Sequence, residues 1–251
     1  MRRRILCIGG TDSSTGAGVT ADLETLNALG ANGVIAITSV TAQSDEVFFS
    51  SHKVASEGLV AQLEASEALP IDGIKIGMLP DKSSIQVVSQ FINKHKSIPS
   101  VMDPVFSSSS GGRLVKTEEL DILIRELFPK VTLLTPNALE AEIITGVPCK
   151  SVEGAKLNAE RLIQLGAQAV LVKGGHLSEP NCTDIFFQKN SNISLVTKAR
   201  IKNAQKCRGT GCRLSTSIAY YLACGDNIKT AVEKGSGLVE QYITSQSPLA
   251  S

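Results

Sequence analysis

Near the end of the chain, a cysteine stands where a glycine-rich turn runs into a helical pattern. The turn is GTGC, residues 209–212, and the apolar-patterned segment RLSTSIAYYLACG follows it. Gly209 and Gly211 allow a tight turn that brings backbone N–H groups close to a ligand. A helix that begins here points its unpaired N–H groups and the positive end of its dipole at that ligand. The pattern is therefore suited to binding an anion, and a phosphoryl group in transfer is one.

The residue type at position 212 adds possible chemistry to this turn. The field that attracts an anion also favours a thiolate, so we expect the pKa of Cys212 to lie below the ordinary value of about 8.5. A thiolate could then accept the proton of a substrate hydroxyl. The alternative is a tight strand-to-helix turn with a small buried residue. A glycine motif of four residues does not by itself separate the two interpretations.

Short apolar segments rich in β-branched residues alternate with helical patterns along the chain. The strand-like segments lie at 4–10, 33–43, 73–78, 100–105, 131–137 and 169–175. The helical patterns lie at 19–31, 57–69, 82–95, 117–128, 151–165, 210–223 and 227–245. Two further strand-like segments, 182–188 and 193–199, have no helix between them and indicate a hairpin.

This order of elements predicts the fold class. Strands that are apolar throughout, rather than alternating with polar residues, are typical of a parallel sheet buried on both faces. We therefore expect an α/β protein with a three-layer αβα architecture and a mostly parallel central sheet. No linker, low-complexity tract or internal repeat divides the sequence. Residues 1–251 are predicted to form a single domain.

Polar or functional side chains follow six of the predicted strands. In open α/β sheets, ligands bind at the carboxyl ends of parallel strands, which share one edge of the sheet. We expect the residues that follow the six strands to gather at that edge as an active site: Asp12, Gln43, Met78, Asp103, Asn137 and Lys173.

The composition excludes several classes of protein. A net charge of +1 leaves no basic excess for neutralising phosphates, and aromatic residues make up only 4% of the chain, so no nucleic-acid partner is expected. The six cysteines contain no CxxC pair, which argues against a zinc site or a disulfide framework. No segment approaches the ~18 apolar residues that span a membrane, and no signal peptide is recognised. We expect a cytoplasmic protein.

Seven motifs occur in order along almost the whole chain: GGTDSSTGAGVTADL (9–23), TAQ (41–43), KIGML (75–79), DPV (103–105), TPNALEAEIITG (135–146), VKGGH (172–176) and GTGC (209–212). Together they resemble the hydroxymethylpyrimidine and phosphomethylpyrimidine kinases of thiamin biosynthesis, which are ribokinase-like. The resemblance covers residues from about 4 to 245. It implies ATP-dependent phosphorylation of 4-amino-5-hydroxymethyl-2-methylpyrimidine and its monophosphate, with Mg²⁺ as cofactor.

The resemblance also implies roles for the motif residues. The turn formed by Gly209, Thr210 and Gly211 would be the anion hole for the γ-phosphate, and Cys212 would be the catalytic base. The pyrimidine pocket would be lined by Asp22, Gln43, Met78 and Val105. The nucleotide side would be formed by Asn137, Glu140, Lys173 and Gly175. Mg²⁺ would be held, largely through water, near Asp103 and Glu140. Relatives of this family are often homodimers, which implies a homodimer here.

The chain departs from the family pattern at several positions. Relatives commonly carry DPSGGAG where this chain has Ser13 and Thr15, and a Lys or Thr in the flap where it has Ser109. Cys207 and Arg208 stand where a threonine and a histidine usually precede the turn. Because a guanidinium pairs well with phosphate, we hypothesise that Arg208 helps to hold the phosphorylated substrate of the second step.

Two alternatives remain open. A pyridoxal or pyridoxine kinase has the same fold, and only the resemblance at Gln43 and Met78 favours the pyrimidine. A non-catalytic ligand-binding relative is the second, although Cys212, Asn137 and Glu140 speak against it. A dinucleotide-binding dehydrogenase fits less well, because no GxGxxG follows the first strand.

Overall fold

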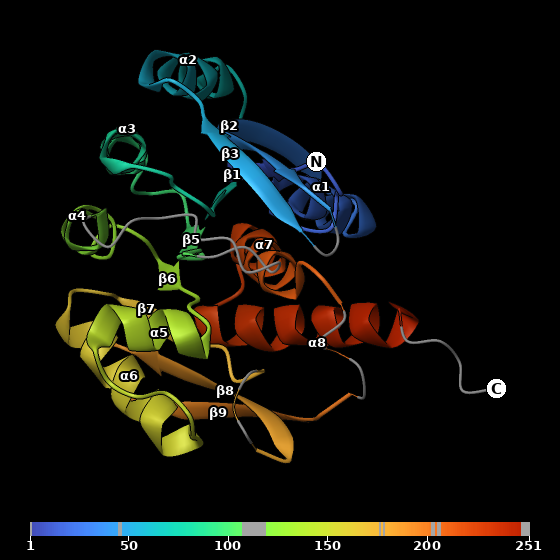
Figure 1. Ribbon diagram of the computed structural model, residues 1–251, viewed down its shortest axis with the longest axis vertical. Coiled ribbons are helices and arrows are strands. Elements are labelled where there is room, and N and C mark those ends of the chain that lie inside the picture. The colour runs from blue at the N-terminus through green and yellow to red at the C-terminus, as the bar shows by residue number, and fades with distance from the viewer. Residues whose placement is uncertain are drawn as a thin grey trace.

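The computed structural model describes residues 2–44, 47–106, 119–175, 177, 179–201, 204 and 207–246. Its strands are β1 Arg4–Asp12, β2 Asn32–Gln43, β3 Phe48–Lys53, β4 Gly73–Ile76, β5 Ser100–Met102, β6 Leu133–Leu134, β7 Ala169–Val172, β8 Asn181–Gln188 and β9 Ser194–Ala199. They form one sheet in the order β3-β2-β1-β4-β5-β6-β7-β8-β9 (Figure 1). The strands from β2 to β7 in this order pair in parallel, and β3, β8 and β9 are antiparallel at the two edges.

Helices cover both faces of the sheet, which confirms the predicted three-layer αβα architecture. One face carries α1 Gly18–Ala28, α7 Thr210–Ala223 and α8 Ile228–Gln246. The other carries α2 Ser56–Glu67, α3 Lys82–Lys94, α4 Leu120–Glu126, α5 Ala138–Thr145 and α6 Val152–Gln164. Within the described ranges, none of these helices is long and apolar enough to cross a lipid bilayer.

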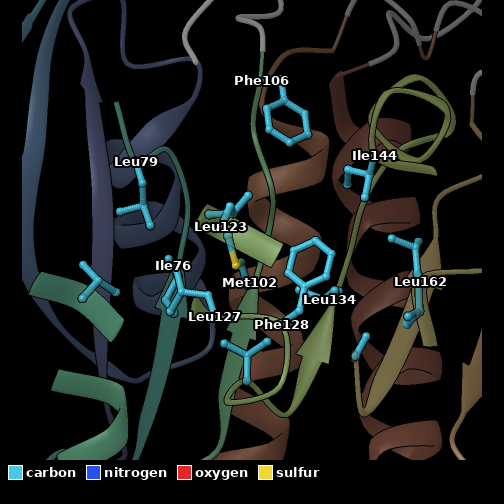
Figure 2. Close-up of a cluster of buried hydrophobic side chains, with 14 of the residues drawn as sticks. Ile76, Leu79, Met102, Phe106, Leu123, Leu127, Phe128, Leu134, Ile144 and Leu162 are labelled. Atoms are coloured by element: carbon cyan, nitrogen blue, oxygen red, sulfur yellow. The ribbon is translucent and has the colours of Figure 1, made fainter. Parts of the chain in front are cut away.

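The larger core cluster fills the space between the sheet and the second group of helices. Figure 2 shows Met102 of β5 and Leu134 of β6 lying among Leu123 of α4 and, just after that helix, Leu127 and Phe128. Leu127, Phe128 and Leu134 have no exposed surface. Burying a side chain of this size contributes about 1.5–3 kcal/mol, so this cluster fixes α4 against the strands whose ends carry Asp103 and Asn137.

Several predicted boundaries were wrong. The strand predicted over 131–137 is reduced to β6, because Asn137 caps α5 and its carboxamide oxygen accepts the N–H of Glu140 at 2.9 Å. Helix α5 was not predicted, nor was β3, which pairs antiparallel with β2. The helix predicted over 117–128 is the shorter α4, and residues 117 and 118 lie outside the described residues. The predicted hairpin is confirmed as β8 and β9.

Asp81 fixes the start of α3 through a capping box with Ser84. Burial acts to raise the pKa of Asp81, but Lys53, at 2.8 Å, and the N–H of Ser84 lower it to about 2. A pKa below the ordinary 3.8 means that this stabilisation is present above about pH 4 and is lost as the pH falls towards 2.

We expect Asp81→Ala to cost about 1 kcal/mol of unfolding free energy at neutral pH. Asp81→Asn keeps a capping oxygen and should cost less. It should also remove the loss of stability that protonation of Asp81 causes at acid pH. Urea unfolding of both variants at neutral and acid pH measures this. If Asp81→Ala is as stable as the wild type at neutral pH, the cap contributes nothing.

Candidate active site

The carboxyl ends of the parallel strands meet at one edge of the sheet, as the sequence predicted. The strands β2, β1, β4, β5, β6 and β7 are consecutive neighbours with the same direction. Their ends therefore place six residues in one row: Gln43, Asp12, Met78, Asp103, Asn137 and Lys173. Asn137 and Lys173 form a parallel bridge that extends the pairing beyond β6 and β7.

A buried ion pair lies beneath the start of α7. Lys173 Nζ is 2.6 Å from Asp103 Oδ1, and the two side chains are 12% and 3% exposed. A Cβ placed on Gly211 would lie 3.1 Å from Lys173 Nζ and 3.5 Å from Asp103 Oδ2. The glycine thus lets the turn rest directly on the ion pair, and the anion-binding turn is brought to the sheet edge.

Glu140 completes this group of charges from α5. Its Oε2 accepts the N–H of Asn137 at 2.7 Å and lies 4.0 Å from Lys173 Nζ. Burial raises the pKa of Glu140 to about 7, against the attraction of Lys173. Burial acts to lower the pKa of Lys173, but Asp103 and Glu140 together raise it above its ordinary value. The lysine therefore remains an ammonium ion between two carboxyl groups.

These two carboxyl groups fit the way proteins hold Mg²⁺. Magnesium is usually bound by one or two carboxylates together with substrate phosphates and water. Among the described residues, no group of three or more His, Cys, Asp or Glu could enclose a metal by itself. The donor set of Asp103 and Glu140 is therefore compatible with a Mg²⁺ ion that arrives with a nucleotide.

Cys212 lies in the first turn of α7, with the N–H of Gly18, at the start of α1, directed at its sulfur. The expected lowering of its pKa was wrong. Burial raises the pKa of the Cys212 thiol, and the nearby Lys75 ammonium and the Gly18 N–H do not offset this effect. Loss of solvation outweighs the local field, so the resting side chain is a thiol at neutral pH.

Sequence reasoning missed Lys75, which forms a second buried ion pair below the site. Its Nζ lies 2.9 Å from Asp22 Oδ2, and the two side chains are 1% and 0% exposed. Thr216 of α7 donates to the other carboxylate oxygen at 2.7 Å. Burial acts to lower the pKa of Lys75, but Asp22, Cys212 and Asp103 raise it above its ordinary value. The lysine inside the apolar segment GIKIGM was the sequence feature that could have indicated a buried charge.

Three residues predicted for the pyrimidine pocket lie at or near the strand ends. Gln43 ends β2, where Ser13 Oγ donates to its carbonyl oxygen at 2.7 Å. A Cβ on Gly10 would lie 3.3 Å from Met78 Sδ. Val105 lines a small cavity of about 10 Å³ behind the site. The fourth, Asp22, is fully buried, with both oxygens bonded as described above.

The other predicted residues divide between the turn and the β7 end. Gly209, with a φ of 69°, precedes Thr210, the first residue of α7. The carbonyl oxygen of Gly175 accepts from Arg200 at 2.8 Å. The predicted flap residue Ser109 lies outside the described residues.

A surface cavity of about 380 Å³ lies at the opposite edge of the sheet. Lys130 and Gln168 line it, and they precede β6 and β7 rather than following them. None of the residues predicted for the site borders this cavity.

The chain is a ribokinase-like phosphotransferase: its sheet is mostly parallel with helices on both faces, and at its carboxyl edge a glycine turn rests on the buried Lys173–Asp103 pair. Residues 12–250 match the family model described as phosphomethylpyrimidine kinase. The chain belongs to the phosphomethylpyrimidine kinase family.

Individual relatives agree with this assignment. The chain is 35% identical to the hydroxymethylpyrimidine/phosphomethylpyrimidine kinase of Bacillus subtilis, over 96% of this chain and 89% of that one. It is 37% identical to the protein of the same name from Aquifex aeolicus, over 97% and 95%.

Solved structures of two kinds are also similar. A phosphomethylpyrimidine kinase from Clostridium difficile is 36% identical with a TM-score of 0.81, over 97% of this chain and 99% of that one. A Staphylococcus aureus pyridoxal kinase in complex with pyridoxal is 26% identical with a TM-score of 0.89, over 99% and 90%.

Proposed function

We propose that this protein transfers the γ-phosphate of ATP to 4-amino-5-hydroxymethyl-2-methylpyrimidine, and then phosphorylates the resulting monophosphate, in thiamin biosynthesis. The observation that carries the proposal is the turn 209–212 at the start of α7, resting on the Lys173–Asp103 pair. Helix-start N–H groups beside a fixed ammonium ion favour a transferring phosphoryl group. The names of the family and of the relatives at 35–37% identity support the same activity.

The mechanism is phosphoryl transfer by positioning and electrostatic stabilisation. The hydroxymethyl oxygen attacks the γ-phosphorus in line, forming a new P–O bond. The bond from the γ-phosphorus to the β–γ bridging oxygen breaks, and ADP leaves. The N–H groups of Gly209, Thr210 and Gly211 stabilise the charge on the transferring group. Cys212 accepts the hydroxyl proton when it is a thiolate, and Lys75 favours that form electrostatically.

The nucleotide side is proposed to include Asn137, Glu140, Lys173 and Gly175. Solved complexes of the similar S. aureus pyridoxal kinase with ADP and with AMP-PCP support ATP as the co-substrate. Mg²⁺ would be held near Asp103 and Glu140, where it would neutralise phosphate charge. Lys173 Nζ lies 2.6 Å from Asp103 and 4.0 Å from Glu140, so it reduces the repulsion between the two carboxyl groups and would supply a positive charge to the phosphates.

The direct test is ADP formation with purified protein, ATP and a panel of vitamin alcohols. We expect turnover with the hydroxymethylpyrimidine and with its monophosphate. An absence of ADP formation with either compound would contradict the proposal and favour the non-catalytic alternative.

Pyridoxal kinase activity is the second candidate, because the TM-score to the S. aureus pyridoxal kinase is 0.89. Higher identity to the pyrimidine kinases, 36% against 26% for the two solved structures, supports the pyrimidine as the preferred substrate. The ratio of kcat/KM for the pyrimidine alcohol and for pyridoxine separates the two. A larger value for pyridoxine would reverse our assignment.

Gln43 is proposed to recognise the pyrimidine. Its side chain projects from the carboxyl end of β2 and donates to Thr41 Oγ1 at 3.2 Å. We expect Gln43→Ala to raise the KM for the pyrimidine about tenfold, by loss of one or two hydrogen bonds, and to leave the KM for ATP unchanged. Steady-state kinetics with each substrate varied in turn measures this. Equal changes in both KM values would place Gln43 elsewhere.

We also propose a homodimer in the cytoplasm. Exposed apolar side chains in β2, in β3 and in the segment before β3 support association: Val40 is 51% exposed, Phe49 70% and Val47 47%. The six cysteines, all among the described residues, are free thiols, which suits a reducing compartment. Sedimentation velocity gives the assembly state, and a monomer at micromolar concentration would contradict the dimer.

A further inference from the structure

Arg208, the residue immediately before the anion-binding turn, is held by the first loop of the chain. Its guanidinium donates to Asp12 Oδ2 at 2.9 Å and to Ser14 Oγ. The side chain of Arg208 is 14% exposed and that of Asp12 is 1% exposed. Residues 12 and 208 are far apart in sequence. This ion pair therefore joins the end of β1 to the residue that precedes the turn 209–211.

Asp12 also accepts hydrogen bonds from residues of the loop that follows β1. Its Oδ1 accepts both the N–H and the hydroxyl of Ser14, at 2.9 and 2.8 Å. The carbonyl oxygen of Asp12 accepts the N–H of Thr15 at 3.0 Å. The carboxylate therefore shapes the loop with one oxygen and binds Arg208 with the other.

The two glycine loops pack directly on each other beside this ion pair. A Cβ on Gly209 would overlap the carbonyl oxygen of Gly16 and would lie 3.3 Å from the Cα of Ala17. A Cβ on Gly16 would lie 3.0 Å from an Arg208 guanidinium nitrogen, so the Arg208 side chain lies across Gly16. The next residues of this loop lead to Gly18, whose N–H is directed at the Cys212 sulfur.

We propose that Arg208 is a positioning residue that, through Asp12, clamps the anion-binding turn 209–211 onto the first loop. A guanidinium with two separate donors fixes both the distance and the orientation between the loops, which a single ammonium point charge does not. The clamp aligns the turn N–H groups with the phosphoryl group, and it holds Gly18 against Cys212.

This inference rests on the proposed kinase function but differs from the hypothesis that Arg208 holds the phosphate of the second substrate. A clamp acts in both phosphorylation steps, because the same turn serves each transfer. A phosphate contact acts only in the second. The two therefore predict different patterns of lost activity.

The test uses Asp12→Asn/Arg208→Met, which removes both charges and so leaves no unpaired buried charge. We expect kcat to fall about 10- to 100-fold with both substrates, as for misalignment by about 1 Å, and each KM to change by less than about twofold. The single variant Arg208→Lys keeps the positive charge but not the guanidinium, and its kcat should remain below that of the wild type. Amide hydrogen exchange at 209–212 should be faster in the double variant.

Glu24→Gln is the matched control. Glu24 pairs with Arg213 at 2.6 Å and so also joins α1 to α7, but Arg213 follows residues 209–211 in the chain and the Glu24 side chain is 55% exposed. Its kcat and its exchange at 209–212 should match the wild type. The clamp is overturned if the double variant keeps full kcat, if its exchange at 209–212 is unchanged, if only the second step is lost, or if Glu24→Gln loses as much.

The exchange measurement separates this inference from the proposed function. Wild-type protein without pyrimidine-dependent ADP formation would contradict the function alone. Unchanged exchange at 209–212 in the double variant, with an active wild type, would contradict the clamp alone.

Discussion

Replacing Cys212 by alanine is expected to lower kcat for the hydroxymethylpyrimidine by about 10²–10⁴, the usual contribution of a general base. The thiol lies in the first turn of α7, beside the turn N–H groups that we propose stabilise the transferring group. Alanine keeps helix propensity at this position, so the melting temperature should change by no more than a few degrees. Steady-state kinetics and thermal unfolding of the same preparation measure both effects.

Cys224→Ala is the control for this prediction, because Cys224 is the exposed residue that ends the same helix. It should leave kcat unchanged. Burial raises the pKa of Cys212, so its base form is populated only as the pH rises, and wild-type kcat should increase with pH above neutrality. This increase should be absent in Cys212→Ala. A fully active Cys212→Ala enzyme would remove the base role.

Lys75→Met is expected to destabilise the protein by about 3–5 kcal/mol, the usual cost of leaving one member of a buried ion pair without its partner. Asp22 would keep its hydrogen bond from Thr216 but would lose the only cation within bonding distance that the structure describes for it. Chemical unfolding monitored by circular dichroism gives this free energy.

The double variant Asp22→Asn/Lys75→Met should recover most of that loss, since neither remaining side chain carries a charge. Lys94→Met is the surface control: Lys94 also pairs with a carboxylate, Glu67, but its side chain is 64% exposed. It should cost about 1 kcal/mol or less. If Lys75→Met and Lys94→Met cost the same, the buried pair has no special importance for stability.

Much of the fold follows from local patterns in the sequence. Apolar strands followed by amphipathic helices predict the parallel sheet, and the residue after each strand is then placed by direction alone. This is why Asp103, Asn137 and Lys173 were expected together, and why they lie in contact. The helix over 210–223 was predicted to the residue, because the glycine turn marks its start.

Features that depend on contacts between residues far apart in sequence could not be predicted from local patterns. Strand β3 exists through pairing with β2, and its outer residues are polar or exposed. The Asp12–Arg208 and Asp22–Lys75 pairs join segments that no local pattern connects. The pKa of Cys212 was misjudged because burial, which raises it, depends on the packing around the turn.

Phosphorus-31 NMR of the reaction mixture tests the central claim most directly. With wild-type protein, ATP, Mg²⁺ and 4-amino-5-hydroxymethyl-2-methylpyrimidine, we predict the resonance of a pyrimidine monophosphate ester, followed by those of the diphosphate, as the ATP γ-phosphate signal declines. A γ-phosphate signal that persists, or that declines into inorganic phosphate with no ester formed, would contradict the assignment of this sheet edge as a pyrimidine-alcohol kinase site.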